Sequence, residues 1–168
     1  MKQTPLSRLV MATLFAALTC IATLVIQLRV TPTGGYVNLG DCCVLLSAWL
    51  LSTPYAVAAA AVGSALADLV AGYAYYAPAT LVIKGLMGWM AGMWLKRGAG
   101  AFHSRNLLLF AGCELWMVAG YFGFECVLYG PAAALGSLAP NLLQGVVGIA
   151  LGLTITPVLE RLKGRMGL

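Results

Sequence analysis

The stretch Gly63-Ser64-Ala65-Leu66-Ala67-Asp68 places a carboxylate inside a long apolar segment. A second charge, Lys84, lies in the next apolar segment. A third, Asp41, opens the preceding segment directly after Gly35-Tyr36-Val37-Asn38-Leu39-Gly40. Membrane helices rarely retain ionisable side chains that have no use. These three positions therefore indicate a helical membrane protein with a polar site between its helices.

The composition favours the same class of protein. Of the 168 residues, 61% are hydrophobic and only 9% are charged, which is more apolar than a soluble core of this size requires. A membrane-crossing helix takes about 20 apolar residues, so the chain has room for about six helices and no soluble domain. We therefore expect an all-α integral membrane protein with a single six-helix domain, 1–168, and no catalytic ATPase in this chain.

Six apolar runs are separated by short breaks that contain glycine, proline or charged residues. The predicted spans are 6–28, 39–52, 54–72, 78–95, 106–129 and 138–159. The first run is longer than the core of a signal peptide, about 7–15 residues, so we interpret it as an uncleaved helix. The second run is short for a full crossing, which favours a tilted or partly re-entrant helix.

Basic residues predict the orientation of these spans. Every Lys and Arg except Arg29 and Lys84 falls near the N-terminus, in the loop 96–105 or near the C-terminus. Cytoplasmic segments are enriched in Lys and Arg, so both termini are expected to be cytoplasmic. The loops expected to face outward are 29–38, 73–78 and 130–140. Because the basic residues are split among separate loops, the net charge of +5 does not predict a nucleic-acid partner.

Small residues accompany Asp68 and Lys84 along their helices. Ser64 precedes Asp68 by four residues, and Gly88 follows Lys84 by four, so each pair shares a helix face that lets a neighbour approach. Asp68 and Lys84 also lie at similar depth, counted at about 1.5 Å per residue from the loop between their spans. We expect them to form an ion pair or to hold a polar ligand between them. A pair that only fixes helix packing is the alternative.

The fifth span carries Glu114, Tyr121 and Glu125 on one face, with Tyr121 and Glu125 toward the outside. Glu125 is therefore the better ligand candidate of the two acids. Glu114 is expected near mid-depth, where a carboxylate is protonated, paired or hydrated, so a role in proton coupling stays open.

The sixth span is expected to open with Pro140, which places Asn141 and Gln144 one turn apart near the outer surface. Carboxamides both donate and accept hydrogen bonds, as recognition of a heterocycle or a hydroxyl-rich solute requires. The alternative is that Asn141 caps the helix and Gln144 bonds to a neighbouring helix.

Two further pairs of residues have alternative interpretations. Asn38 and Asp41 are spaced almost as in a capping box, so they either start the second helix or contribute to a site. Tyr73 and Tyr76 either belong to the outer aromatic belt or stack on a flat ligand.

Polar residues from several spans thus converge in the outer half of the predicted bundle, which is the pattern of a solute pocket. The candidate substrate-binding residues are Asn38, Asp41, Asp68, Tyr73, Tyr76, Lys84, Tyr121, Glu125, Asn141 and Gln144. No cofactor and no metal are expected, because the five cysteines form no C-x-x-C pair and have no histidine nearby.

Three blocks of this sequence resemble the substrate-binding S components of energy-coupling factor (ECF) transporters, notably the riboflavin-transporter-like group. The blocks are Gly35-Tyr36-Val37-Asn38-Leu39-Gly40-Asp41, Gly63-Ser64-Ala65-Leu66-Ala67-Asp68-Leu69, and Gly72-Tyr73 through Lys84-Gly85-Leu86-Met87. The resemblance implies six helices in a prokaryotic plasma membrane and capture of a vitamin from outside. It also implies docking onto a membrane T subunit driven by two cytoplasmic ATPases, so that ATP is used by the partners. An A-x-x-x-A pattern of the family matches Ala12 and Ala16, which are then expected to meet the T subunit.

The resemblance leaves the substrate open among riboflavin, pyridoxine-like compounds and pyrimidine or thiamine precursors. A self-sufficient proton-coupled carrier, with Glu114 and Asp68 as relay residues, is the alternative function. An intramembrane enzyme is not expected, because the single histidine, His103, lies in the basic loop and no phosphate-binding loop is present. A purely structural membrane subunit would leave the polar cluster without a ligand.

Overall fold

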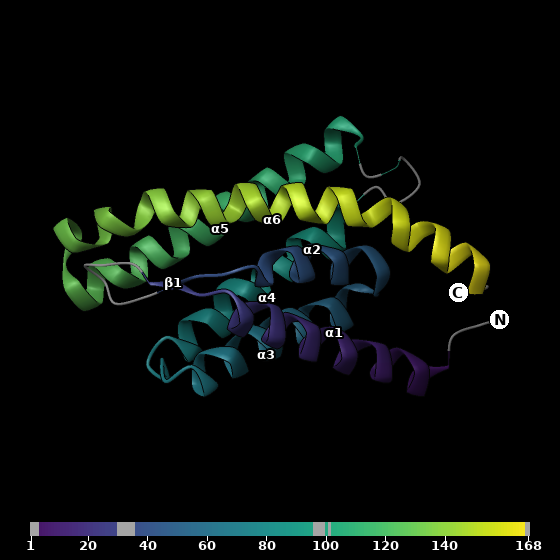
Figure 1. Ribbon diagram of the computed structural model, residues 1–168, viewed down its shortest axis with the longest axis horizontal. Coiled ribbons are helices and arrows are strands. Elements are labelled where there is room, and N and C mark those ends of the chain that lie inside the picture. The colour runs from purple at the N-terminus through teal and green to yellow at the C-terminus, as the bar shows by residue number, and fades with distance from the viewer. Residues whose placement is uncertain (1–3, 30–35, 96–99, 101, 167–168) are drawn as a thin grey trace.

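Six helices and one short β-hairpin make up the described part of the chain. The computed structural model describes residues 4–29, 36–95, 100 and 102–166. The elements are α1 (Pro5–Val25), β1 (Leu28–Arg29), β2 (Tyr36–Val37), α2 (Gly40–Leu50), α3 (Thr53–Val70), α4 (Ala77–Trp94), α5 (Ser104–Tyr129) and α6 (Pro131–Met166). Figure 1 shows them packed as one bundle, in which α1 begins and α6 ends at the same end of the molecule.

Four helices in the described ranges are long and apolar enough to cross a membrane, which is typical of a multi-pass membrane protein. They are Pro5–Val25, Thr53–Val70, Ser104–Tyr129 and Pro131–Arg161. The helix α2 has 11 residues. At about 1.5 Å per residue it cannot cross a hydrocarbon core of about 30 Å. The expected all-helical class is confirmed, whereas six membrane crossings and cytoplasmic termini stay predictions.

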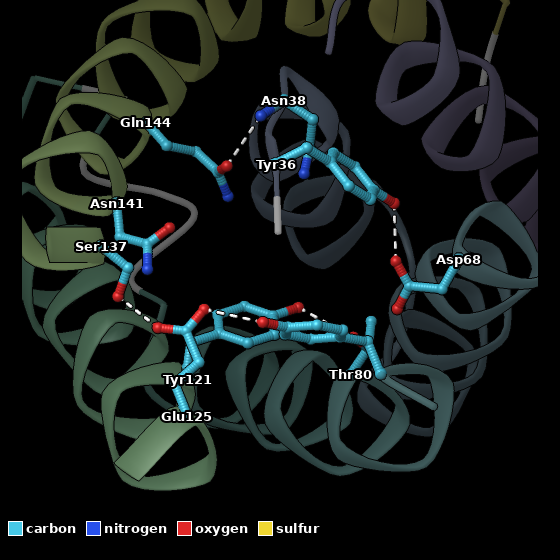
Figure 2. Close-up of a pocket in the computed structure, with 10 residues that line it drawn as sticks. Tyr36, Asn38, Asp68, Thr80, Tyr121, Glu125, Ser137, Asn141 and Gln144 are labelled. Carbon is cyan, nitrogen blue, oxygen red and sulfur yellow. Dashed lines mark hydrogen bonds between the residues drawn. The ribbon is translucent and has the colours of Figure 1, made fainter. Parts of the chain in front are cut away.

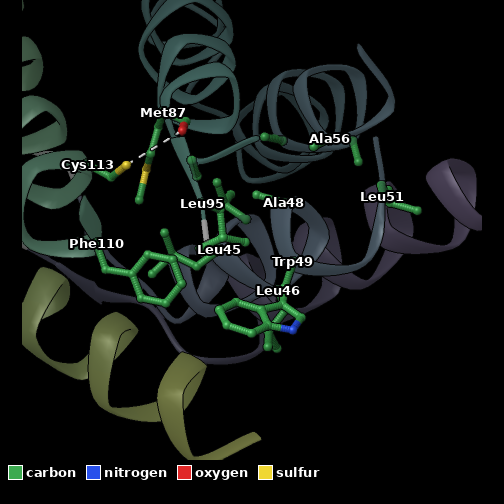
Figure 3. Packing of buried hydrophobic residues seen from close by; sticks show 14 of the residues in the cluster. Leu45, Leu46, Ala48, Trp49, Leu51, Ala56, Met87, Leu95, Phe110 and Cys113 are labelled. Carbon is green, nitrogen blue, oxygen red and sulfur yellow. Dashed lines mark hydrogen bonds between the residues drawn. The ribbon is translucent and has the colours of Figure 1, made fainter. Parts of the chain in front are cut away.

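The short helix α2 lies at the centre of the bundle, in contact with α1, α3, α4 and α6. Its residues Leu45 and Ala48 are fully buried. Met87 from α4 and Phe110 from α5 belong to the same hydrophobic cluster (Figure 3). Because α2 is covered by helices on several sides, its sequence is apolar all round rather than amphipathic.

Small residues let the helices around α2 pack closely. A Cβ atom at Gly88 of α4 would lie 3.1 Å from the backbone oxygen of Ala56 in α3. A Cβ atom at Gly63 of α3 would lie 2.5 Å from the backbone oxygen of Ala16 in α1. The predicted small-residue contact between α3 and α4 is thus confirmed, and α1 approaches α3 in the same way.

The predicted loop 130–140 is wrong, because α6 already begins at Pro131. Gly130 alone separates α5 from α6, and its φ of 85° lies in the left-handed region that glycine tolerates best. A proline suits the first turn of a helix, where its missing N–H would have no partner. Pro140 is enclosed within α6, which packs along α5. Packing between the two helices thus outweighs the single hydrogen bond that Pro140 removes.

The β-hairpin is an element that the sequence analysis did not predict. Leu28 pairs with Val37 and Arg29 with Tyr36 in antiparallel register. The hairpin brings Tyr36 and the following Asn38 beside the helices. Residues 30–35, which include Gly35 of the quoted motif, and the basic residues Lys96 and Arg97 lie outside the described residues.

Close packing at Gly63 gives a test of the fold. In Gly63→Ala the added methyl group meets the backbone of α1, and such overpacking costs about 1–3 kcal/mol. Gly112→Ala is the matched control, because no atom lies within 4 Å of its added Cβ atom. Thermal unfolding in detergent should show a lower midpoint for Gly63→Ala and an unchanged or higher one for Gly112→Ala. Equal midpoints would contradict the packing of α1 on α3.

Candidate polar pocket

A polar pocket lies where α3 and α5 end and where α4 and α6 begin (Figure 2). It encloses about 440 Å³, open solvent at its mouth included. The residues that line it are Tyr36, Asn38, Asp68, Tyr76, Thr80, Tyr121, Glu125, Ser137, Asn141 and Gln144. Its walls therefore come from the end of the hairpin and from four helices.

The two carboxylates of the pocket accept hydrogen bonds from hydroxyl groups. Tyr36 donates to Oδ1 of Asp68 at 2.6 Å, while Oδ2 of Asp68 is buried without a hydrogen-bond partner. Tyr76 donates to Oε1 of Glu125 at 2.9 Å, and Ser137 donates to Oε2. Burial and the neighbouring Asp68 carboxylate raise the pKa of the Tyr36 hydroxyl, which therefore stays a donor at neutral pH.

An ion pair lies beside the pocket, between Lys84 of α4 and Asp41 of α2. The two residues are 2% and 0% exposed. Gln144 of α6 connects this pair to the pocket, because its Nε2 donates to Oδ2 of Asp41 at 2.5 Å and its Oε1 accepts from the Asn38 backbone at 2.8 Å. The first of the two expectations for Lys84 and Asp68, a direct ion pair, is wrong, because Lys84 pairs with Asp41 at the start of α2. The second, a polar ligand held between them, stays a prediction.

The start of α2 clarifies the expected capping box. The Asn38 side chain accepts a hydrogen bond from the Gly40 backbone at 2.8 Å, as a residue that begins a helix does. The helix itself has no side-chain cap at Leu39, and Asp41 lies within its first turn. The capping interpretation of Asp41 is therefore wrong, since its carboxylate is used by Lys84 and Gln144.

A third carboxylate, Glu114 of α5, is buried beside this ion pair. Its side chain is 4% exposed, and both of its oxygens lack a hydrogen-bond partner. A Cβ atom at Gly148 of α6 would lie 3.0 Å from Oε1 of Glu114 and 3.0 Å from Cβ of Asp41. The absence of a side chain at Gly148 thus makes room for two neighbouring acids, and Glu114 has no hydrogen-bond partner among the described residues.

Tyrosine rings form much of the pocket surface and its surroundings. The rings of Tyr76 and Tyr121 have centroids 6.4 Å apart, and Thr80 shares a hydrogen bond of 3.0 Å with Tyr121. Tyr73 does not line the pocket but packs on Tyr36, with ring centroids 4.9 Å apart. It therefore supports the wall rather than forming it.

The structure brings most of the candidate residues together. Those that line the pocket are Asn38, Asp68, Tyr76, Tyr121, Glu125, Asn141 and Gln144. Asp41 and Lys84 lie behind Gln144. Tyr36, Thr80 and Ser137 also line the pocket and were not among the predicted candidates. Thr80 stands one helical turn before Lys84, which could have indicated it, whereas Tyr36 and Ser137 lay in presumed loops.

The two alanines expected to meet a T subunit lie on the side of α1 that faces α3. Ala12 is buried, and Ala16 is half-buried against Gly63. Both also border an apolar groove between α1 and α3. Their role in partner binding stays a prediction.

Fold and pocket together define a class: a helical membrane protein with a polar pocket at one end of its bundle. The sequence matches the family described as ECF-type riboflavin transporter, S component, over residues 4–161. The chain belongs to this family. It is therefore a transporter S component and not an enzyme.

Two relatives show how similar the chain is to known proteins. A protein of Pyrococcus woesei, named "Uncharacterized protein in gap 3'region", is 35% identical over 144 residues, which cover 86% of this chain and 95% of the relative. The thiamine precursor transporter HmpT of Lactococcus lactis subsp. cremoris (strain MG1363) is 35% identical over 100 residues, which cover 57% of this chain and 52% of HmpT. The second match thus spans about half of that transporter.

The ion pair between Lys84 and Asp41 can be tested by neutralising each residue alone and then both together. Lys84→Met alone or Asp41→Asn alone leaves a buried charge without its partner, at a cost of about 3–5 kcal/mol. The double variant removes both charges and should recover most of the loss. Thermal unfolding in detergent measures the series, with Asp68→Asn as a control outside the pair. Single variants that unfold at the wild-type temperature would contradict the pairing.

Proposed function

We propose that this S component captures a water-soluble vitamin or vitamin precursor from outside a prokaryotic cell and delivers it for ATP-driven uptake. The observation that carries the proposal is the pocket, in which ten polar or aromatic residues from five elements and two connecting segments surround one space. Family membership supports the role of a binding subunit. The name of the relative HmpT supports a vitamin precursor as the kind of solute.

The chemistry of the pocket suits a flat, polar solute. Tyr76 and Tyr121 offer ring faces for stacking, while Asn141 and Asp68 offer polar groups at the pocket wall. Riboflavin, pyridoxine-like compounds and pyrimidine or thiamine precursors all combine a flat ring with such polar groups.

The proposed partners are a membrane T subunit and two cytoplasmic ATPases. This chain is expected to use no cofactor of its own, because ATP is hydrolysed by those partners. Ala12 and Ala16 border an apolar groove of α1 and α3 that suits contact with an apolar helix. In the proposed orientation, which the distribution of Lys and Arg predicts, both termini are cytoplasmic and the pocket lies toward the outer side of a prokaryotic plasma membrane.

Ligand binding tests the proposed function. The protein is purified in detergent and titrated by calorimetry with riboflavin, pyridoxine and an aminopyrimidine precursor of thiamine, and co-purified solutes are identified by mass spectrometry. One of these compounds should bind at one site per chain. Gln144→Ala should weaken it by tenfold or more, because it removes the link between Asn38 and Asp41. Gly112→Ala should bind as the wild type does. Failure of every candidate to bind would reject the proposal.

A self-sufficient proton-coupled carrier is the second candidate function, and the unpartnered carboxylate of Glu114 is the observation that favours it. Vesicles that contain only this chain provide the test. If the chain is a binding subunit, a pH gradient alone drives no uptake, and Glu114→Gln keeps wild-type ligand affinity because Glu114 does not line the pocket. Uptake that needs no ATPase and is abolished in Glu114→Gln would establish the carrier instead.

A further inference from the structure

The charge of the pocket is one-sided. Among the residues that the structure describes, its ten lining residues include the acids Asp68 and Glu125 but no lysine, arginine or histidine. The nearby cation Lys84 is buried in an ion pair with Asp41 and lies 5.6 Å from the centroid of the Tyr121 ring, so it does not itself line the pocket. A solute that enters the pocket therefore meets carboxylates and no unpaired cation among the lining side chains.

Most polar groups of the pocket already have partners within the protein. Each oxygen of Glu125 accepts a hydroxyl hydrogen bond, one from Tyr76 and one from Ser137. The carboxamide of Gln144 is bonded at its oxygen to the Asn38 backbone and at its nitrogen to Asp41. These groups shape the wall, but their hydrogen-bonding atoms are already engaged.

Two lining side chains keep groups free for a solute. Oδ2 of Asp68 has no hydrogen-bond partner although the side chain is only 5% exposed. Asn141 is 7% exposed, and its carboxamide makes no hydrogen bond to any described residue. Figure 2 shows the two on opposite sides of the pocket, with Tyr121 between them along one wall. A flat ring lying along Tyr121 would present one edge to Asp68 and the other to Asn141.

The chemistry of these two groups restricts the solute. When Asp68 is ionised its carboxylate only accepts hydrogen bonds, so the solute edge at Asp68 then supplies an N–H or O–H donor. A carboxamide donates and accepts, so the edge at Asn141 must supply a donor next to an acceptor, as an amino-substituted or lactam-containing ring does. A carboxylate or phosphate on the solute would instead bring acceptor oxygens and negative charge to the pocket acids, in surroundings that screen charge poorly.

Building on the proposed function, we propose that this pocket selects uncharged or cationic nitrogen heterocycles that carry hydrogen-bond donors, and that it rejects their phosphorylated and carboxylated forms. Asp68 and Asn141 are the two specificity-determining residues. Asp68 receives a donor from the ring and repels anions, and Asn141 reads the opposite edge. The protein would thus take up the free vitamin or precursor and leave its phosphate ester outside.

The test compares matched pairs of compounds on the wild-type protein in detergent. Calorimetric titrations use riboflavin and its 5′-phosphate, pyridoxine and its 5′-phosphate, and an aminopyrimidine precursor of thiamine and its phosphate. For whichever pair binds, the phosphate ester should bind at least 100-fold more weakly than the free compound. An ester that binds as tightly as the free compound would overturn the selectivity and leave the proposed function intact. Binding of no compound would overturn both.

Two variants separate the roles of the residues. Asp68→Asn keeps the size of the side chain but removes the charge. It should weaken binding of the free compound tenfold or more and reduce the ratio between the affinities for the free compound and for its ester. Asn141→Ala should weaken binding of the free compound to a similar extent but leave the ratio between the affinities for the free compound and for its ester unchanged. Melting temperatures near that of the wild type show that each variant is folded. A ratio unchanged in a folded Asp68→Asn protein would remove Asp68 from the selectivity.

Discussion

The ion pair between Lys84 and Asp41 is the constraint on which the rest of the site depends. A lysine in the interior of a membrane bundle is costly unless an acid neutralises it, and α2 supplies that acid at its first turn. Gln144 then ties the pair to α6 and to the backbone before α2. The side chains of Lys84, Asp41 and Gln144 thus fix the positions of α4, α2 and α6 relative to one another. The pocket lies directly against this arrangement and takes its shape from it.

Sequence reasoning succeeded where neighbouring residues share one helix. Glu125 follows Tyr121 by four residues and Gln144 follows Asn141 by three, so helical periodicity alone places each pair on one face. It failed where the partner comes from another helix. Either Asp68 or Asp41 could have been the ion-pair partner of Lys84. Which one pairs depends on the position of each helix along its neighbour, and no local sequence pattern encodes that position. The interhelical partner was therefore wrong although all three residues were singled out.

Irregular segments account for the other errors. Tyr36 reaches the pocket because a two-residue ladder fixes the chain before α2, and such a short strand has no periodicity to detect. Ser137 belongs to the helical residues 131–139 that precede Pro140, a residue that ordinarily indicates a helix boundary. The packing of α6 along α5 overrides that signal. The same packing brings Ser137 to Glu125, which explains why the acid needs no cation of its own.

The single residue Gly130 has a mechanical consequence for the pocket. It is the only residue between helices of 26 and 36 residues, so α5 and α6 are joined by a very short connection at the end where the pocket lies. These two helices carry Tyr121, Glu125, Asn141 and Gln144, so four of the lining residues belong to one helical hairpin. The opposite side of the pocket consists of β2, the end of α3 and the start of α4, and no comparably short connection joins it to α5 and α6.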